Sequence, residues 1–218
     1  MENKNCPDKD RERFEELFGC EPSVHVHSPG RANIIGEHTD YNDGLVFPFS
    51  IESRITVHAA PNGTNKVRLY GRAFDEAAEF DLKELKRKKH WSDYVKGVLH
   101  ELSRRKLSVK GFDAYFGGDL PIASGLSSSA ALELAVCRTC SLLEDFELDP
   151  IEEIKLCRQA ENQFVGVSCG IMDQFAIRMG QEHHGVFIDC RDLSFELVPI
   201  PSDELVFVIT YSGVKRGL

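Results

Sequence analysis

The segment Ser28–Asn42 constrains this chain more than any other, because it gathers charged side chains and glycines beside apolar sequence. It contains one arginine, two carboxylates and one histidine, and the apolar run Leu45–Phe47 lies next to it. Burying an ion without a partner costs several kcal/mol or more, so these charges cannot build a core. Carboxylates accept hydrogen bonds from pairs of hydroxyls, and histidine can donate or accept. The segment is therefore typical of a pocket for a small polyol.

Other interpretations of the same residues remain open. Glu37, His38 and Asp40 could form a metal site, although no second cluster at ligand spacing follows them. A calcium loop beginning at Asp40 needs glycine at its sixth position, where the sequence has Leu45, and glutamate at its twelfth, where it has none. A purely structural polar turn is the remaining alternative.

A second motif is the Gly/Ser-rich loop Leu120–Ala131, which runs directly into the helix-forming sequence Leu132–Val136. Such a loop presents free backbone N–H groups and the positive end of the helix dipole, which together bind phosphate. It is not a Walker P-loop, because the Gly-Lys-Ser/Thr run is missing. It is not a hydrolase nucleophile elbow either, because Ser129 stands where that motif ends in glycine. An ordinary serine helix cap is the alternative.

Two isolated acids lie in apolar sequence further along the chain. A helix is predicted from Pro150, with Asp149 as its cap, and Glu161 shares a stripe with apolar residues at helical spacing. A buried glutamate needs a partner or a proton, and both a salt bridge to an arginine and a magnesium ion shared with ATP would supply a partner. Asp173, in the segment Ser168–Phe175, could be only a helix N-cap.

The periodicity predicts an α+β fold, a mixed sheet with helices packed on one face. Strands are expected at 24–27, where they lead into the polar segment, and at 45–60, 66–71, 112–116, 185–189, 194–198 and 205–211. Helices are expected at 10–19, 91–104, 128–143 and from residue 150 onward.

Composition narrows the function classes. The 218-residue chain has a formal net charge of -9, which argues against a nucleic-acid partner, since phosphates demand a basic face. No apolar run approaches the length needed to span a membrane, and no apolar stretch follows the charged first residues, so neither a membrane partner nor a signal peptide is expected. Seven scattered cysteines suit reduced thiols and a cytoplasmic location. Cys137 and Cys140 are expected to pack inside a helix.

Together the motifs resemble a known family. Ser28–Asn42 resembles the galactokinase signature, the loop before Ala130 resembles the phosphate-binding motif of the GHMP kinase superfamily, and Ser168–Gln174 resembles a further galactokinase pattern. A fourth, weaker feature is Trp91, at the position of an aromatic that stacks on adenine in relatives. The resemblance implies the N-terminal domain of a GHMP kinase, a fold like domain 2 of ribosomal protein S5, over residues 1–218.

The resemblance implies transfer of the γ-phosphoryl group of ATP to the anomeric hydroxyl of galactose, with ATP and Mg²⁺ required. Asp173 would be the catalytic base, and Arg31 would stabilise its charge and that of the transferring group. The implied sugar-binding residues are Arg31, Glu37, His38, Asp40, Gly170 and Asp173. The implied nucleotide-binding residues are Trp91, Ala123, Ser124, Gly125, Leu126, Ser127, Ser128 and Ser129, and Ser129 with Glu161 would hold magnesium.

The chain departs from this family in two ways. It is shorter, so we expect the C-terminal GHMP domain to be absent, residues 200–218 at most to begin it, activity to be impaired, and the uncovered surface to favour self-association. Position 123 is also alanine where many relatives have glycine. A non-catalytic galactose and ATP sensor, or a GHMP kinase for arabinose or N-acetylgalactosamine, remains an alternative. The run Glu37–Tyr41 argues against mevalonate, which lacks a row of hydroxyls.

Overall fold

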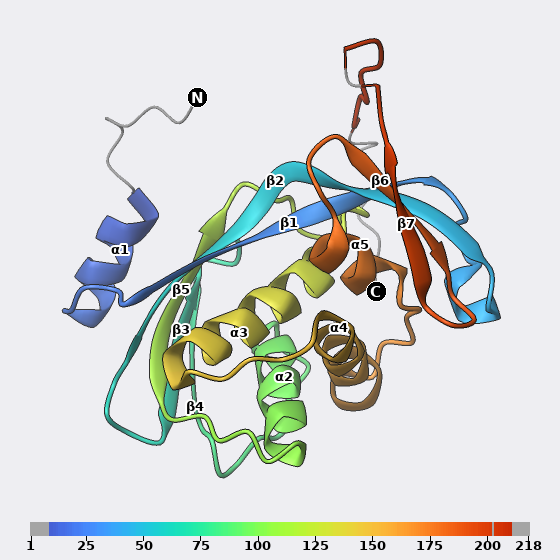
Figure 1. The fold of residues 1–218 in the computed structure, drawn as a ribbon. Helices are drawn as coiled ribbons and strands as arrows, with labels where there is room; N and C mark the ends of the chain where they lie inside the picture. Colours follow the sequence, from blue (N-terminus) through green and yellow to red (C-terminus); the bar gives the residue numbers. More distant parts are fainter. Residues whose placement is uncertain (1–8, 202, 211–218) are drawn as a thin grey trace.

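A seven-stranded mixed sheet forms the frame of the computed structural model, which describes residues 9–201 and 203–210 (Figure 1). The strand order is β4-β3-β5-β2-β6-β7, and β1 also pairs with β2. Only β3 and β5 pair in parallel among the described strands, and the other pairs are antiparallel. The strands are β1 (Val24–Ile35), β2 (Leu45–Pro61), β3 (Lys66–Gly71), β4 (Glu76–Asp81), β5 (Phe112–Gly118), β6 (His184–Asp189) and β7 (Ser194–Pro199).

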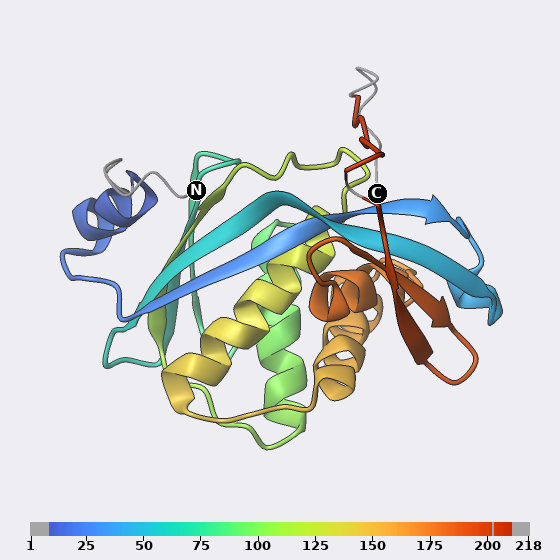
Figure 2. The ribbon, with the colours of Figure 1, turned by 45° about the horizontal axis from the view of Figure 1, so that its top comes forward.

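Helices cover one face of this sheet, as Figures 1 and 2 show from two directions. They are α2 (Ser92–Arg104), α3 (Ser128–Glu144), α4 (Pro150–Gln159) and α5 (Met172–Met179). The main core lies between them and the strands, where Phe112, Ala114 and Phe116 of β5 alternate inward. The α+β prediction is confirmed, and no helix among the described residues is long and apolar enough to cross a membrane.

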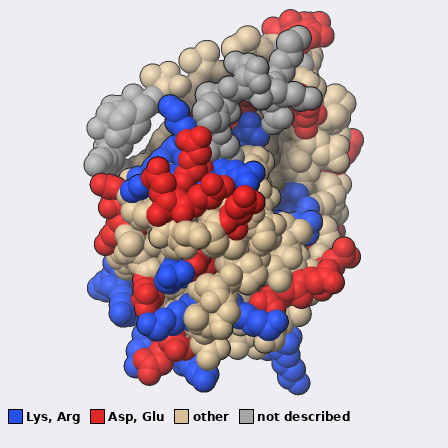
Figure 3. All heavy atoms as spheres, turned by 90° about the vertical axis from the view of Figure 1, so that its left-hand side faces the viewer, with Lys and Arg blue, Asp and Glu red and all other residues tan. Residues whose placement is uncertain are grey.

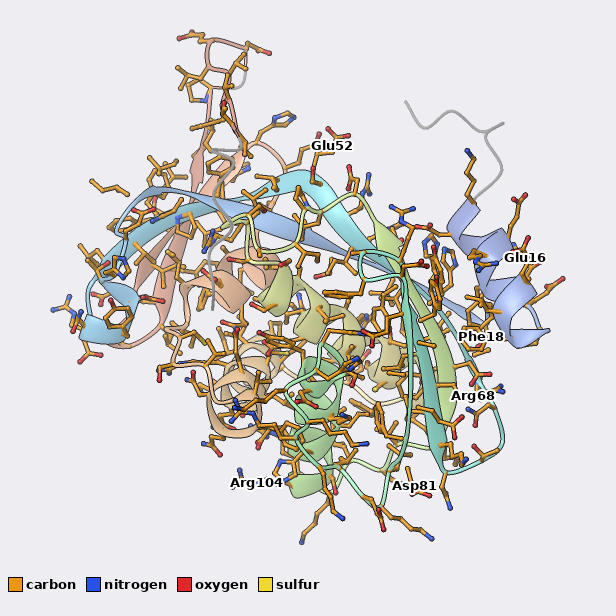
Figure 4. All side chains as sticks on the ribbon, turned by 180° about the vertical axis from the view of Figure 1, so that it is seen from behind. Glu16, Phe18, Glu52, Arg68, Asp81 and Arg104 are labelled. Atoms are coloured by element: carbon orange, nitrogen blue, oxygen red, sulfur yellow. The ribbon has the colours of Figure 1, made fainter. Side chains whose placement is uncertain are left out.

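Helix α1 (Lys9–Phe18) packs on the opposite face of the sheet, against β5 and β2. Phe14 is buried there against Ala60 and Tyr115. Figure 4 shows from behind that Phe18 lies near Arg68 of β3. The Arg68 guanidinium is 5.7 Å from the centroid of the Phe18 ring. The side of the molecule seen in Figure 3 intersperses Lys and Arg with Asp and Glu, so that side presents no continuous basic patch for nucleic acid.

Asp10 anchors α1 to the sheet. We expect Asp10→Ala to lower the free energy of unfolding by about 2 kcal/mol, because three partly buried or exposed donors lose their acceptor. Its carboxylate accepts hydrogen bonds from Thr56 Oγ1 (2.8 Å), Arg72 Nη1 (2.8 Å) and Gly118 N (2.9 Å). Urea unfolding followed by circular dichroism measures the change. Glu16→Ala, at an exposed pair on the same helix, is the control, and an equally small loss in both variants would contradict the anchor.

The helix predicted from Pro150 changes from an α-helix to a π-helix before Glu161. Asp149 caps α4 as expected, accepting from the N–H groups of Ile151 and Glu152. After Gln159 the chain continues as a π-helical turn, η2 (Ala160–Val165), which ends at Gly166 with φ +79°. Glu161 is buried, as the predicted stripe requires, but it lies in a π-helical turn and not in a continuous α-helix. Single π-helical turns of this kind are frequent at functional sites.

Several expectations about elements were wrong. Strand β1 was expected to end at residue 27 but continues through residues 28–35 of the polar segment, and β4 and α5 were not predicted. Residues 205–210 form no strand, although their composition favours one, because no described strand pairs with them. Residue 211 of that predicted strand lies outside the described residues. Strand β1 also shifts register against β2 between Pro29 and Arg31, an irregularity that can redirect a side chain.

Candidate active site

The Arg31 side chain links β1 to the start of α5. Its Nε and Nη2 atoms each lie 2.7 Å from Asp173 Oδ1, and both side chains are mostly shielded from solvent. The third nitrogen, Nη1, donates to the carbonyl oxygen of Gly125 in the serine loop, also at 2.7 Å. The Arg31 guanidinium thus connects the polar segment Ser28–Asn42 to the serine loop at Gly125 and to the candidate base Asp173. Ile171 occupies the N-cap position of α5, so the interpretation of Asp173 as an N-cap was wrong.

Ser127 holds the second oxygen of the same carboxylate. Its Oγ donates to Asp173 Oδ2 at 2.5 Å, and the residue has a left-handed backbone with φ +58°. Although Ser127 occupies the N-cap position of α3, its side chain does not cap the helix. The serine-cap alternative is therefore wrong for this residue. The first-turn N–H groups of α3 lack this cap, and a helix start of that kind is suited to bind an anion.

The loop before Ser127 contains further left-handed residues. Ala123 has φ +56° and Gly125 has φ +80°. A left-handed conformation costs an alanine about 1 kcal/mol more than a glycine, which explains physically why glycine suits position 123. Ser124 Oγ donates to the carbonyl oxygen of Pro121 at 2.9 Å and stabilises the turn.

The acidic turn of the first motif packs against the segment before α5. Asp40 begins a short 3₁₀ helix, η1 (Asp40–Asn42), and its Oδ2 accepts from the N–H of Met172 at 3.2 Å. A Cβ added to Gly170 would lie 1.7 Å from the same oxygen, so a larger residue there would displace the Asp40 carboxylate. His38 Nδ1 bonds to the Tyr41 hydroxyl at 2.7 Å, and both His38 and Glu37 are exposed. Asp40 and Gly170 thus adjoin the Asp173 segment, while Glu37 and His38 stand at the surface of the turn.

A cavity of about 300 Å³ opens beside the start of α3. Trp91 lines it and stacks on Phe74, with ring centroids 5.4 Å apart and an interplanar angle of 9°. Ser128 and Ser129 line another part of the same cavity. A mostly apolar pocket with aromatic rings on one side and helix N–H groups on another is suited to a base and its phosphates.

The carboxylate of Glu161 is buried behind Ser129. It accepts hydrogen bonds from Gln174 Nε2 at 2.9 Å and from the Cys169 thiol at 3.3 Å. Burial raises the pKa of Glu161, and hydrogen bonds from Cys169, Ser129 and Gln174 oppose that rise. Among the described residues no arginine or lysine pairs with it, so the salt-bridge alternative is wrong. Within the described ranges, no three His, Cys, Asp or Glu side chains lie close enough together to hold a metal ion by themselves.

Comparisons with known proteins match the same regions. The galactokinase galactose-binding signature matches residues 12–61, and the N-terminal domain of GHMP kinases matches residues 93–181. The galactokinase of Chloroflexus aurantiacus is 44% identical over 94% of this chain and 53% of that protein. The galactokinase of Thermococcus kodakarensis is 43% identical over 89% of this chain and 55% of that protein. The chain is similar to galactokinases over most of its length. It spans about half the length of the curated relatives it matches.

Solved structures give the same fold. The Lactococcus lactis galactokinase complexed with galactose has a TM-score of 0.82 and 42% identity, over 87% of this chain and 50% of that chain. The Methanococcus jannaschii mevalonate kinase has a TM-score of 0.69 and 19% identity, over 83% of this chain and 57% of that chain. This second likeness concerns the fold alone.

Sequence reasoning on the galactokinase motifs missed four residues of this site. Phe74 and Tyr94 line the cavity with Trp91, and Tyr94 lies within the helix predicted at 91–104. Glu133 and Gln174 are fully buried beside Glu161. An acid at position 133 inside the apolar run Leu132–Val136 was the available signal for that pair.

Proposed function

We propose that this chain supplies the sugar-binding and catalytic groups for transfer of the γ-phosphoryl group of ATP to the anomeric hydroxyl of galactose. The observation that carries the proposal is the Asp173 carboxylate, held at Oδ1 by Arg31 and at Oδ2 by Ser127. The same arginine reaches the serine loop at Gly125. The candidate base therefore adjoins both the polar turn and the phosphate-binding loop.

In this proposal Asp173 accepts the proton of the anomeric hydroxyl as its oxygen attacks the γ-phosphorus. The bond from that phosphorus to the bridging oxygen breaks, and ADP leaves with the electron pair. Arg31 offsets the negative charge of Asp173 and of the transferring group. Phosphoryl transfer depends mostly on positioning and electrostatic stabilisation, and these residues provide both.

The sugar is proposed to bind at the turn beside α5. Asp40, Glu37 and His38 offer acceptors and a donor for sugar hydroxyls, and Gly170 lets the chain pass close to Asp40. The Lactococcus lactis galactokinase, whose structure was solved in complex with galactose, supports this choice of sugar.

Gly170→Ala tests the sugar site, and we expect it to weaken galactose binding at least about tenfold, or about 1.4 kcal/mol. The added methyl group would occupy the space of the Asp40 carboxylate, which would have to move. Isothermal titration calorimetry with galactose measures the change. Ser168→Ala, at an exposed position of the same segment, is the control, and equal affinity in both variants would contradict the sugar site.

The nucleotide is proposed to bind in the cavity, with its base near Trp91 and its phosphates near the N–H groups that begin α3. Oxygen ligands are those that Mg²⁺ prefers, and the Ser129 hydroxyl and Glu161 carboxylate fit that requirement. When bound, Mg²⁺ would neutralise charge on the phosphates of ATP. Ser129 and Glu161 would hold it.

An ADP-release assay with a panel of sugars tests the proposed reaction in the protein at its full natural length. We expect galactose to give the fastest turnover, ahead of arabinose, N-acetylgalactosamine and glucose. Calorimetry on the same samples measures binding of galactose and ATP separately. Binding of both ligands without ADP release would favour the sensor alternative, and a faster rate with another sugar would overturn the assignment to galactose.

A further inference from the structure

The Gln174 side chain connects two buried acids. It is 0% exposed, and its Nε2 donates to Glu161 Oε2 at 2.9 Å and to Glu133 Oε2 at 3.2 Å. An amide nitrogen carries two hydrogens, so one Gln174 amide can serve both carboxylates at once. This uses the full donor capacity of the amide nitrogen.

Glu133 is otherwise unexplained by the proposed reaction. It is 0% exposed and lies four residues after Ser129 on α3, so the two side chains share one face of that helix. Its Oε2 accepts a hydrogen bond from Gln174, whereas no lysine or arginine among the described residues forms an ion pair with it. Burying an acid costs free energy, because ionic and polar groups lose hydration on burial. The position of Glu133 therefore calls for an explanation.

Asp173 and Gln174 are consecutive residues of α5, and consecutive side chains on an α-helix point about 100° apart. One helix therefore directs Asp173 toward Arg31 and Gln174 toward Glu161. Any shift of α5 therefore moves Asp173, the candidate base, together with Gln174, which supports the candidate metal ligand Glu161. The chain of contacts runs from α3 through α5 to η2.

We propose that Gln174 is a positioning residue for the magnesium ligand Glu161, and that Glu133 anchors Gln174 by accepting its second N–H. This inference rests on the proposed function, because it assigns Gln174 and Glu133 to the same magnesium-ATP site. Neither residue touches ATP or the sugar in this arrangement. Their effect is to hold the Glu161 carboxylate in place beside Ser129.

Trp91, the only tryptophan of the chain, lines the cavity and gives a direct fluorescence readout of nucleotide binding. The quantity to measure is the ratio of the ATP dissociation constant with EDTA to that with Mg²⁺. Gln174→Met keeps similar bulk but removes both donors, and we expect it to lower this ratio about tenfold. Galactose affinity and metal-free ATP affinity should stay within about twofold of the unaltered protein.

Glu133 is tested by a pair of variants. Glu133→Gln keeps an oxygen that accepts from Gln174, so the ratio should stay within about twofold, whereas Glu133→Met should lower it clearly. Thr139→Val is the matched control, since Thr139 is also buried on α3 but lies about 15 Å along the helix from Ser129. It should change the melting temperature without changing the ratio.

The outcomes separate the two proposals. If the unaltered protein binds ATP equally with and without Mg²⁺, the proposed magnesium site and this inference both fail. If Mg²⁺ strengthens binding but both methionine variants keep the original ratio, only the inference fails. Equal losses in Glu133→Gln and Glu133→Met would overturn the anchoring role. Should Gln174→Met not fold, as judged by galactose binding and melting, the Glu133 pair decides the question.

Discussion

Asp173→Asn is expected to reduce phosphoryl transfer at least about 100-fold while leaving galactose binding nearly unchanged. The amide keeps the shape of the carboxylate and can still accept the Ser127 hydrogen bond, but it cannot take up the proton of the attacking hydroxyl. ADP release gives the rate, and isothermal titration calorimetry gives the galactose affinity. A rate within a few fold of the unaltered protein would show that Asp173 is not the base.

The control for this variant is Asp145→Asn. Asp145 is far along α3 from the site, and its left-handed backbone is one that asparagine tolerates. The control should keep both the rate and the galactose affinity. If Asp173→Asn also abolished galactose binding, the loss of the Arg31 ion pair would have disturbed the sugar site, and the two effects would have to be separated with Arg31→Lys.

Glu161→Gln is expected to weaken binding of ATP in the presence of Mg²⁺ at least about tenfold, with galactose affinity and metal-free ATP affinity nearly unchanged. Only a cation requires the charge of this side chain, because the amide can still accept the hydrogen bonds of Gln174 and Cys169. Fluorescence of Trp91 with and without Mg²⁺ measures the two affinities.

Glu153→Gln is the matched control for that experiment. Glu153 is also a buried acid on the adjoining helix, but it pairs with Arg178 and lies outside the proposed site. It should lower the melting temperature without affecting the response to Mg²⁺. Equal loss of galactose and ATP binding in Glu161→Gln, with a lower melting temperature, would point to a structural role for Glu161.

Most long elements could be predicted from sequence because their signals are local. The limits of α2 and α3 follow from apolar periodicity, and the start of α4 follows from the Asp149-Pro150 capping pattern. Strand β4 could not be predicted, because Glu76–Asp81 is poor in strand-forming residues and pairs only through its neighbour β3. Residues 205–210 show the reverse case, strand-forming sequence without a described partner.

The candidate site also has features that local sequence patterns predict and contacts that only the tertiary structure shows. The sequence by itself determined which segments are candidates for binding sugar and phosphate, because a polar segment in apolar surroundings and a serine loop before a helix are local patterns. It could not determine that Ser127 turns from its helix to Asp173, 46 positions away, or that Arg31 reaches the same carboxylate across 142 positions. Those contacts depend on β1 passing the start of α5. Nor could it assign a role to Glu133, because burial and the Gln174 bridge exist only after three elements have packed together.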